Sequence, residues 1–283
     1  MLCSARLREG RYKYMLDFPA INPVAIQIFG FSFHWYGLMY VLAFATSYVL
    51  ARIRVNKTGS GWTMEQVSDL LFYSMIGVIV GGRIGYFLFY IDPEYWFSPP
   101  WQLLLINNGG MSFHGGALGV IAGIWFFARR HSKSFLQVGD FVAPLVPLGL
   151  GFGRIGNFIN GELWGRVVSA EFPLGMVFPT GGPLPRHPSQ LYQAALEGLV
   201  LFIILWWYSS KPKPSGSTGA LFLLCYGIAR FCVEFVRQPD AHLQFVAFDW
   251  MTMGHVLSLP MIAIGLGLFA YCWLRHGQAN QQL

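Results

Sequence analysis

The polar residues with the clearest chemical potential lie in the stretch GFGRIGNFINGELWGR, which runs from Gly151 to Arg166. This stretch ends an apolar run that begins at Phe135, and it interleaves Arg154, two asparagines and Glu162 with five glycines. The end of a helix needs only one or two polar groups to complete its backbone hydrogen bonds. The surplus predicts a functional site, with Arg154 as its leading member because neighbouring glycines leave a guanidinium unobstructed.

The elements that position this stretch are predicted to be membrane helices. The chain has 283 residues, of which 54% are hydrophobic and only 11% are charged, whereas soluble domains carry about 25% charged residues. Its mean hydropathy is +0.47. The net charge of +6 is scattered, and no basic face or nucleic-acid module accompanies it, so a nucleic-acid partner is excluded. The composition predicts a polytopic membrane protein.

The cysteines add no recognisable chemistry of their own. They form no CxxC pair and no Cys/His spacing typical of a metal site; they are Cys3, Cys225, Cys232 and Cys272. We therefore expect no disulfide framework, no bound metal, no cofactor and no nucleophilic thiol belonging to the protein itself.

Seven stretches are apolar over roughly the 20 residues that a helix needs to cross a bilayer. They are Phe33–Ile53, Val67–Ile91, Met111–Ala128, Phe135–Ile159, Leu191–Tyr208, Ala220–Val236 and His255–Leu274. No large soluble domain fits between them. Residues 15–283 are therefore predicted to form a single all-α membrane domain with seven transmembrane helices.

The charges of the loops predict the orientation, because Lys and Arg concentrate in cytoplasmic loops. The first, third and fifth loops are basic, whereas the second, from Asp92 to Gly110, contains no Lys or Arg. We expect the N-terminus on the outer, periplasmic side and the C-terminus in the cytoplasm. Residues 1–14 break this rule with Arg6, Arg8, Arg11 and Lys13. We interpret them as a non-native or disordered extension, with translation starting at Met15.

In this orientation, unusual polar residues from six spans lie at one depth, in the outer leaflet. They are Tyr36, Arg83, His114, Arg154, Asn157, His187, Gln190, Arg230, Glu234 and Arg237. Each arginine inside a membrane costs roughly 2.5–3.5 kcal/mol, so several at one level require an anion or a water-filled cavity. A phosphate suits guanidinium geometry. The sequence therefore predicts a site for a phospholipid head group.

Simpler explanations exist for some of these residues. Arg237 can snorkel to the membrane interface. Arg230 and Glu234 can form an internal ion pair, because they are four residues apart on one helix. Glu197, in the fifth span, is ambiguous, and we interpret it as structural.

Three histidines compete for the role of a general base, which arginine cannot fill. His114 is the best-placed group that titrates near neutral pH, although it can also cap an interfacial turn. His34 suits an aromatic belt because it lies between Phe33 and Trp35. His187 is a weaker candidate.

The loop from about residue 160 to residue 189 is long and rich in Pro and Gly. Loops of this length usually form lids or binding surfaces, so we expect an ordered periplasmic cap over the outer site. Two predicted spans also carry glycines four residues apart, a spacing that favours close packing of membrane helices. These glycines are Gly77, Gly81 and Gly85, and Gly115, Gly119 and Gly123.

Five blocks of the sequence resemble the bacterial prolipoprotein diacylglyceryl transferases. They are HWYGLMY at His34–Tyr40, GGMSFHGG at Gly109–Gly116, GRIGNFINGELWG at Gly153–Gly165, RHPSQLYQ at Arg186–Gln193 and YGIARFCVEFVRQPD at Tyr226–Asp240. The similarity runs in the same order from about Met15 to the last span. The block in the fourth span is long and very specific to this family.

The resemblance implies a reaction at the bacterial inner membrane. Family members transfer the diacylglyceryl group of phosphatidylglycerol to the lipobox cysteine of a prolipoprotein signal peptide, which forms a thioether and releases glycerol phosphate. The implied catalytic residues are His114, Arg154, Arg230, Tyr36 and Asn157. The implied lipid-binding residues are Arg154, Arg230, Glu162, Gly165, Glu234 and Arg237. We add Arg83 to them, because it is predicted to lie at the same membrane depth.

The implied chemistry agrees with the residue types. A free thiol has a pKa of about 8.5, so little of it is ionised at neutral pH, and His114 is the expected base. Arg154 and Arg230 are expected to stabilise the leaving phosphate. An outer-leaflet phospholipid transporter or flippase is the alternative, but it should show a polar path through the membrane, and the cytoplasmic halves of the spans are apolar. A receptor-like seven-helix protein would have no need of His114.

Overall fold

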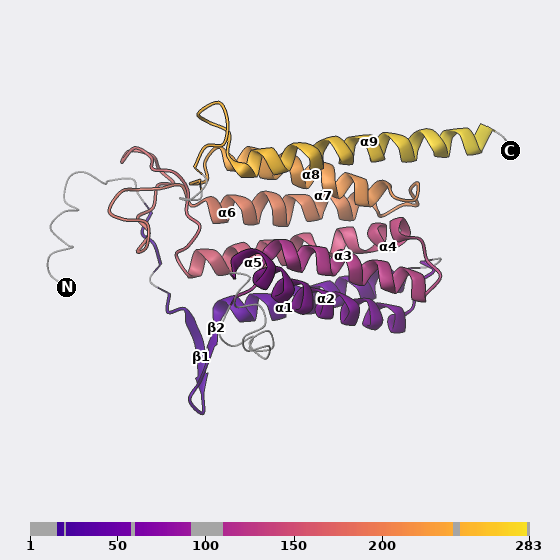
Figure 1. Ribbon diagram of the computed structural model, residues 1–283, viewed down its shortest axis with the longest axis horizontal. Coiled ribbons are helices and arrows are strands. Elements are labelled where there is room, and N and C mark those ends of the chain that lie inside the picture. Colours follow the sequence, from indigo (N-terminus) through magenta and orange to yellow (C-terminus); the bar gives the residue numbers. More distant parts are fainter. Residues whose placement is uncertain (1–15, 20, 58–59, 92–109, 240–243, 282–283) are drawn as a thin grey trace. The chain divides into compact units, whose positions relative to one another are not determined.

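The computed structural model describes residues 16–19, 21–57, 60–91, 110–239 and 244–281 (Figure 1). The chain divides into two compact units. The central unit comprises Tyr48–Phe141, and the terminal unit comprises Met1–Ser47 with Val142–Leu283. The extension 1–14 and the expected start at Met15 lie outside the described residues.

Helices α2 and α3 pack closely in the central unit. Helix α2 runs from Met64 to Tyr90 and α3 from Phe113 to Arg130. A Cβ atom placed on Gly77 would collide with the carbonyl group of Gly119, and one on Gly85 would lie 2.7 Å from the Cα atom of Gly115. The close packing predicted from the glycine spacing is therefore confirmed. The central unit also contains the second half of α1 (Trp35–Val55) and most of α4 (Phe135–Val142).

The terminal unit contains the other elements. They are β1 (Val24–Ile28), β2 (Phe31–His34), the first half of α1, a 3-10 turn (Ala143–Leu145), α5 (Pro147–Ile159), α6 (Ser189–Gln193), the π-helical segment η5 (Ala194–Val200), α7 (Leu201–Tyr208), α8 (Ser217–Glu234) and α9 (Met253–Gln281). In Figure 1, α6 and α7 lie in line, so that they form one continuous rod with η5 between them.

The expectation of an all-α chain is wrong at one hairpin. Strands β1 and β2 pair antiparallel, and Phe29 and Gly30 turn the chain between them with φ angles of 50° and 84°. Valine and isoleucine in β1 favour a strand, and glycine accepts the positive φ of a tight turn. The first helix consequently begins at Trp35, two residues later than the span predicted from Phe33.

Five described helices are long and apolar enough to cross a membrane. They are Trp35–Val55, Met64–Tyr90, Ser189–Tyr208, Ser217–Glu234 and Met253–Gln278. A sixth span exists if Phe135–Leu145 and Pro147–Ile159 form one bent helix pair, and Pro144 and Pro147 account for the break because proline interrupts a helix. Helix α3 is present as predicted, but it ends in Arg129 and Arg130 and is not among these candidates. The described chain is mostly helical and consistent with a polytopic membrane protein.

Helices α8 and α9 approach each other closely through glycines. A Cβ atom on Gly227 of α8 would lie 3.3 Å from the carbonyl oxygen of Ser258 in α9. A Cβ atom on Gly265 of α9 would lie 2.9 Å from the Cα atom of Leu224 in α8. This close approach brings the start of α9 against the end of α8, where several charged residues lie.

The cap segment, residues 160–188, is irregular but well bonded. Met176 and Arg186 exchange backbone hydrogen bonds of 3.0 and 2.9 Å. Met176 and Phe178 pack with Phe158 at the end of α5 to form a small buried core, against which Phe18, Trp164 and Leu191 also pack. The order expected of this loop is therefore present among the described residues.

Candidate functional site

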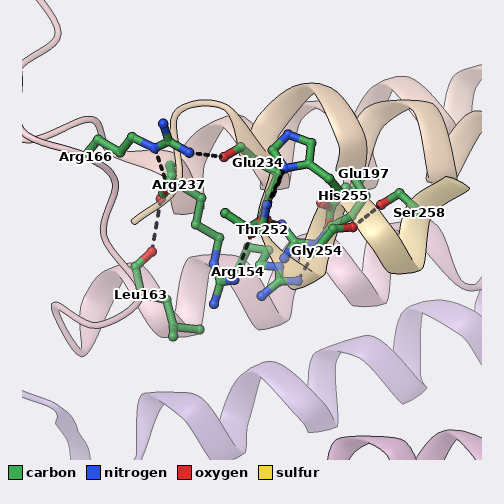
Figure 2. Close-up of polar contacts among 12 residues, drawn as sticks. Arg154, Leu163, Arg166, Glu197, Glu234, Arg237, Thr252, Gly254, His255 and Ser258 are labelled. Carbon is green, nitrogen blue, oxygen red and sulfur yellow. Dashed lines mark hydrogen bonds and ion pairs between the residues drawn. The ribbon is translucent and has the colours of Figure 1, made fainter. Parts of the chain in front are cut away.

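Five charged side chains form what we call the arginine–glutamate cluster of the terminal unit. They are Arg154 of α5, Glu197 of η5, Arg230 and Glu234 of α8, and Arg237 just after α8. Figure 2 labels all of them except Arg230. Arg154 Nη2 lies 3.5 Å from Glu197 Oε2. Glu234 pairs with two arginines, at 2.6 Å from Arg230 Nη1 and 3.7 Å from Arg237 Nη1. The ion pair that the sequence allowed between Arg230 and Glu234 is present.

The two kinds of charge in the cluster differ in exposure. The side chains of Arg154, Arg230 and Arg237 are 24%, 16% and 13% exposed, whereas those of Glu197 and Glu234 are 0% and 2% exposed. The buried carboxylates offset part of the cost of gathering three arginines in one place. A ligand that approaches the cluster meets guanidinium groups, so the arrangement suits an anion.

The start of α9 contacts the carboxylate of Glu234 (Figure 2). Thr252 Oγ1 donates a hydrogen bond of 2.7 Å to Glu234 Oε1. The backbone N–H of Thr252 donates to His255 Nδ1 at 3.2 Å. A Cβ atom on Gly254 would lie 2.6 Å from both carboxylate oxygens of Glu234, so only glycine leaves room for them.

His255 is fully buried in an aromatic box. The centroids of the Phe231, Phe235 and Trp250 rings lie 4.8, 4.6 and 5.3 Å from the centroid of its imidazole. Neither Thr252 nor His255 was singled out from the sequence. The available signal was a threonine directly before the last helix with a histidine three residues later, a spacing typical of a capped helix start.

Glu197 owes its position to the π-helical geometry of η5. Its neighbour Gly198 crosses Gly151 of α5 so closely that a Cβ on Gly198 would lie 2.8 Å from the Gly151 Cα atom. Arg154 lies one turn beyond Gly151, which places its guanidinium opposite Glu197. π-Helical turns occur frequently at functional sites. The sequence alone did not reveal this pairing, because hydropathy does not distinguish a π turn from an α turn.

Tyrosines from two helices surround Arg154. Tyr226 of α8 and Tyr40 of α1 both lie within electrostatic range of Arg154. The hydroxyls of Tyr40 and Tyr36 lie 3.5 Å apart. The Tyr36 ring packs against Gly156, where an added Cβ would lie 3.0 Å from Cδ2. The predicted site residue Tyr36 therefore lies against the helix that carries Arg154.

Asn157 and Glu162 organise the end of α5. Asn157 Nδ2 and Asn160 Nδ2 donate to Glu162 Oε1 at 2.9 and 3.2 Å. Gln190 Nε2 donates to the backbone carbonyl of Glu162 at 2.6 Å. These bonds join α5, the cap segment and α6, so the contacts of Asn157 and Glu162 position the helix end.

Gly165 joins the cap segment to the end of α8. Its N–H donates to the His187 carbonyl at 2.8 Å, and the next residue, Arg166, donates its N–H to the Val236 carbonyl at 2.8 Å. A Cβ on Gly165 would lie 2.6 Å from both the Val236 carbonyl oxygen and the His187 Cβ. No larger residue fits there, which explains why this position of the sequence block needs glycine.

Arg166 extends the positive charge outward from the cluster. Its guanidinium donates to the backbone carbonyls of Arg237 and Glu234 at 3.1 and 3.4 Å (Figure 2). It also lies over the Phe245 ring. Arg166 and Phe245 line an open cleft of about 540 Å³ together with Val167, Gln238, Pro239 and Gln244.

His114 and Arg83 belong to the central unit. His114 is exposed in the first turn of α3, which Ser112 caps by accepting a 3.2 Å hydrogen bond from the Gly115 N–H. Arg83 is buried, donates a 2.7 Å hydrogen bond to the Gly110 carbonyl and lies over the rings of Tyr86 and Phe87. Arg83 thus stabilises the turn that leads to His114.

The two rival histidines lie in the terminal unit. His34 is exposed at the end of β2. His187 lies 3.3 Å from the Tyr192 hydroxyl, and desolvation lowers the pKa of its imidazole below the ordinary value. The described residues contain no group of three or more His, Cys, Asp or Glu side chains placed to hold a metal ion.

Comparison with known proteins identifies the family. The family model described as prolipoprotein diacylglyceryl transferase matches residues 23–271. The chain belongs to this family.

Several curated members of the prolipoprotein diacylglyceryl transferase family match nearly the whole chain. A protein of Oleidesulfovibrio alaskensis is 58% identical over 94% of this chain and 98% of its own length. Proteins of Nitratidesulfovibrio vulgaris and Pseudomonas paraeruginosa are 56% and 54% identical, over 90% and 92% of this chain and 95% and 97% of their own lengths. All three are named phosphatidylglycerol–prolipoprotein diacylglyceryl transferase. The resemblance seen in the sequence blocks is confirmed.

Proposed function

We propose that this chain is an enzyme that transfers the sn-1,2-diacylglyceryl group of phosphatidylglycerol to the lipobox cysteine thiol of a prolipoprotein. Its family and the names of its relatives support the reaction. The structural observation that carries the proposal is the arginine–glutamate cluster, in which partly exposed guanidinium groups lie in front of buried carboxylates. Guanidinium groups bind phosphate oxygens in bidentate geometry, as recognition of the lipid phosphodiester requires.

The proposed reaction is a displacement at carbon. The cysteine sulfur attacks the glycerol carbon that carries the phosphodiester, the carbon–oxygen bond breaks, and glycerol phosphate leaves. Arg154 and Arg230 bind the phosphate and stabilise the charge that develops on the leaving oxygen. Glu234 and Arg237 support Arg230 in this role through their ion pairs.

The remaining predicted residues have supporting roles in the proposed reaction. Tyr36 and Asn157 orient the head group by hydrogen bonds. Glu162 and Gly165 hold the end of α5 and the cap segment in position. His114 is assigned as the thiol base from the family resemblance, and Arg83 acts through the turn that leads to it.

The proposal includes an orientation in the membrane. The five or six candidate spans become seven if α3 and the bent pair both cross the bilayer. With basic odd-numbered loops in the cytoplasm, the N-terminus and the cap segment face the periplasm of a bacterial inner membrane. The lipid then enters from the outer leaflet, and the signal peptide approaches through the bilayer.

The experiment is incubation of the purified protein with phosphatidylglycerol and a lipobox peptide, with the peptide scored by mass. The peptide should gain one diacylglyceryl group with the native protein and none with Arg154→Ala. Arg275→Ala is the matched control, because Arg275 is exposed near the end of α9 and should be dispensable. A peptide of unchanged mass with the native protein, together with movement of labelled phosphatidylglycerol across vesicles, would establish a transporter instead.

A further inference from the structure

Glu197 is a buried carboxylate with few hydrogen bonds. Its side chain is 0% exposed, and its ion pair with Arg154 measures 3.5 Å, longer than the roughly 2.7–2.9 Å of a tight charge-assisted bond. Apart from this contact with Arg154, no described residue donates a hydrogen bond to its carboxylate oxygens. Glu234, by contrast, receives a 2.7 Å hydrogen bond from Thr252 and pairs with two arginines.

Burial and nearby positive charges act on Glu197 in opposite directions. Arg154 faces it from α5, Tyr226 and Arg230 from α8, and Arg237 from the segment after α8. These three arginines favour the carboxylate, whereas burial favours the neutral acid. A change in the charge of a bound ligand can therefore tip Glu197 from one state to the other.

The proposed reaction makes such a change of charge. Three arginines and two ionised glutamates give the cluster a net charge of +1, which one phosphodiester anion neutralises. Departure of the phosphate produces a monoester, which is a dianion above its second pKa of about 6. If Glu197 then carries a proton, the net charge of the cluster is +2 and the dianion neutralises it again. Arg166 contributes the same charge to both states and leaves this difference unchanged.

We propose that Glu197 takes up the proton that the cysteine thiol loses during transfer, so that the site stays electrically neutral as the lipid phosphodiester becomes glycerol phosphate. The carbon–sulfur bond forms, and the carbon–oxygen bond breaks with its electron pair on the phosphate oxygen. The proton leaves the sulfur and finally resides on Glu197. This end point is the same whether His114 or another group carries the proton first. This inference rests on the proposed function.

The test is proton uptake when glycerol phosphate binds to the purified full-length protein. Titration calorimetry in buffers of different ionisation enthalpy measures it directly. At about pH 8 free glycerol phosphate is already a dianion, so any proton taken up goes to the protein. The native protein should take up about one proton per ligand, and its Kd should rise about tenfold per pH unit.

Two carboxylate variants assign the proton. Glu197→Gln should bind glycerol phosphate without proton uptake and with a Kd that no longer depends on pH in this range. Glu171→Gln, which alters an exposed carboxylate of the cap segment, should behave like the native protein. Binding without proton uptake by the native protein, or uptake that persists in Glu197→Gln, would overturn the proposal.

A second measurement covers the case in which Glu197→Gln fails to fold. Glu197→Asp keeps a titratable carboxyl group at this position. In the native protein, infrared difference spectra should show the carbonyl band of a protonated carboxylic acid when glycerol phosphate binds. Absence of that band would also overturn the proposal. These measurements report on product binding, whereas failure of the proposed function would appear in the peptide mass, so the two failures can be distinguished.

Discussion

Gly254 offers a way to displace the Glu234 carboxylate without touching any charged residue. A Cβ at this position would lie 2.6 Å from both carboxylate oxygens, and ordinary contact begins at 3.4 Å. The carboxylate carbon lies nearer still, so in Gly254→Ala the carboxylate must withdraw by about 1 Å, or α9 must move by a similar distance. Arg230 and Arg237 would move with the carboxylate, because both are paired with it.

The expected magnitude follows from this displacement. A misplacement of roughly 1 Å near a reacting centre costs on the order of 10²-fold in rate, which corresponds to about 2.7 kcal/mol. Overpacking lowers the free energy of unfolding by roughly 1–3 kcal/mol. The higher helix propensity of alanine raises it by up to about 1 kcal/mol. Gly254→Ala should therefore fold and remain in the membrane while its kcat/KM falls about 100-fold.

The assay is the rate of diacylglyceryl transfer to a lipobox peptide over a range of phosphatidylglycerol concentrations. Gly267→Ala is the matched control, because Gly267 lies on the same helix and an added Cβ there meets no atom within 4 Å. The control should retain full kcat/KM. Native kcat/KM in a folded Gly254→Ala protein would refute the role assigned to the Glu234 carboxylate.

Four further predictions concern single residues. Arg154→Lys should lose most transfer activity, about 10²-fold or more, because an ammonium cannot reproduce a bidentate contact; full activity would contradict the phosphate role. His114→Gln should abolish the acidic limb of the pH–rate profile. An unchanged limb would show that another residue is the base. Thr252→Val should raise the KM for phosphatidylglycerol several-fold, because Glu234 loses a hydrogen bond, and Thr252→Ser should restore it. Burial lowers the pKa of His187 in the folded protein, so the unfolded chain binds more protons near pH 6.5. Thermal stability should therefore fall as the pH drops through that range. It should fall less in His187→Gln.

The parts of the site that follow local spacing could be predicted from the sequence. The pair Arg230 and Glu234 follows from the four-residue helical repeat, and the packing of α2 on α3 follows from glycines with the same spacing. Glu197 could not be placed, because a π turn leaves no trace in hydropathy. The contact of Thr252 with Glu234 joins two helices across a loop, and such a contact depends on tertiary packing rather than on local pattern.

The hairpin of β1 and β2 escaped prediction for a related reason. Phe33 of β2 lies directly before the apolar span, so composition alone extends the helix back to this residue. The turn at Phe29 and Gly30 was the available signal, because a glycine between two short apolar runs favours a strand reversal.

The π-helical segment also has a consequence for how this protein can vary. Deleting a single residue between Ala194 and Val200 would allow the ordinary helical repeat to resume, because a π-helical turn holds one residue more than an α-helical turn, and it would shift the side chains inside the segment relative to those of the flanking helices. Composition, length and membrane insertion would hardly change, yet Glu197 would no longer point at Arg154. The site therefore depends on the number of residues in this segment as well as on their identity.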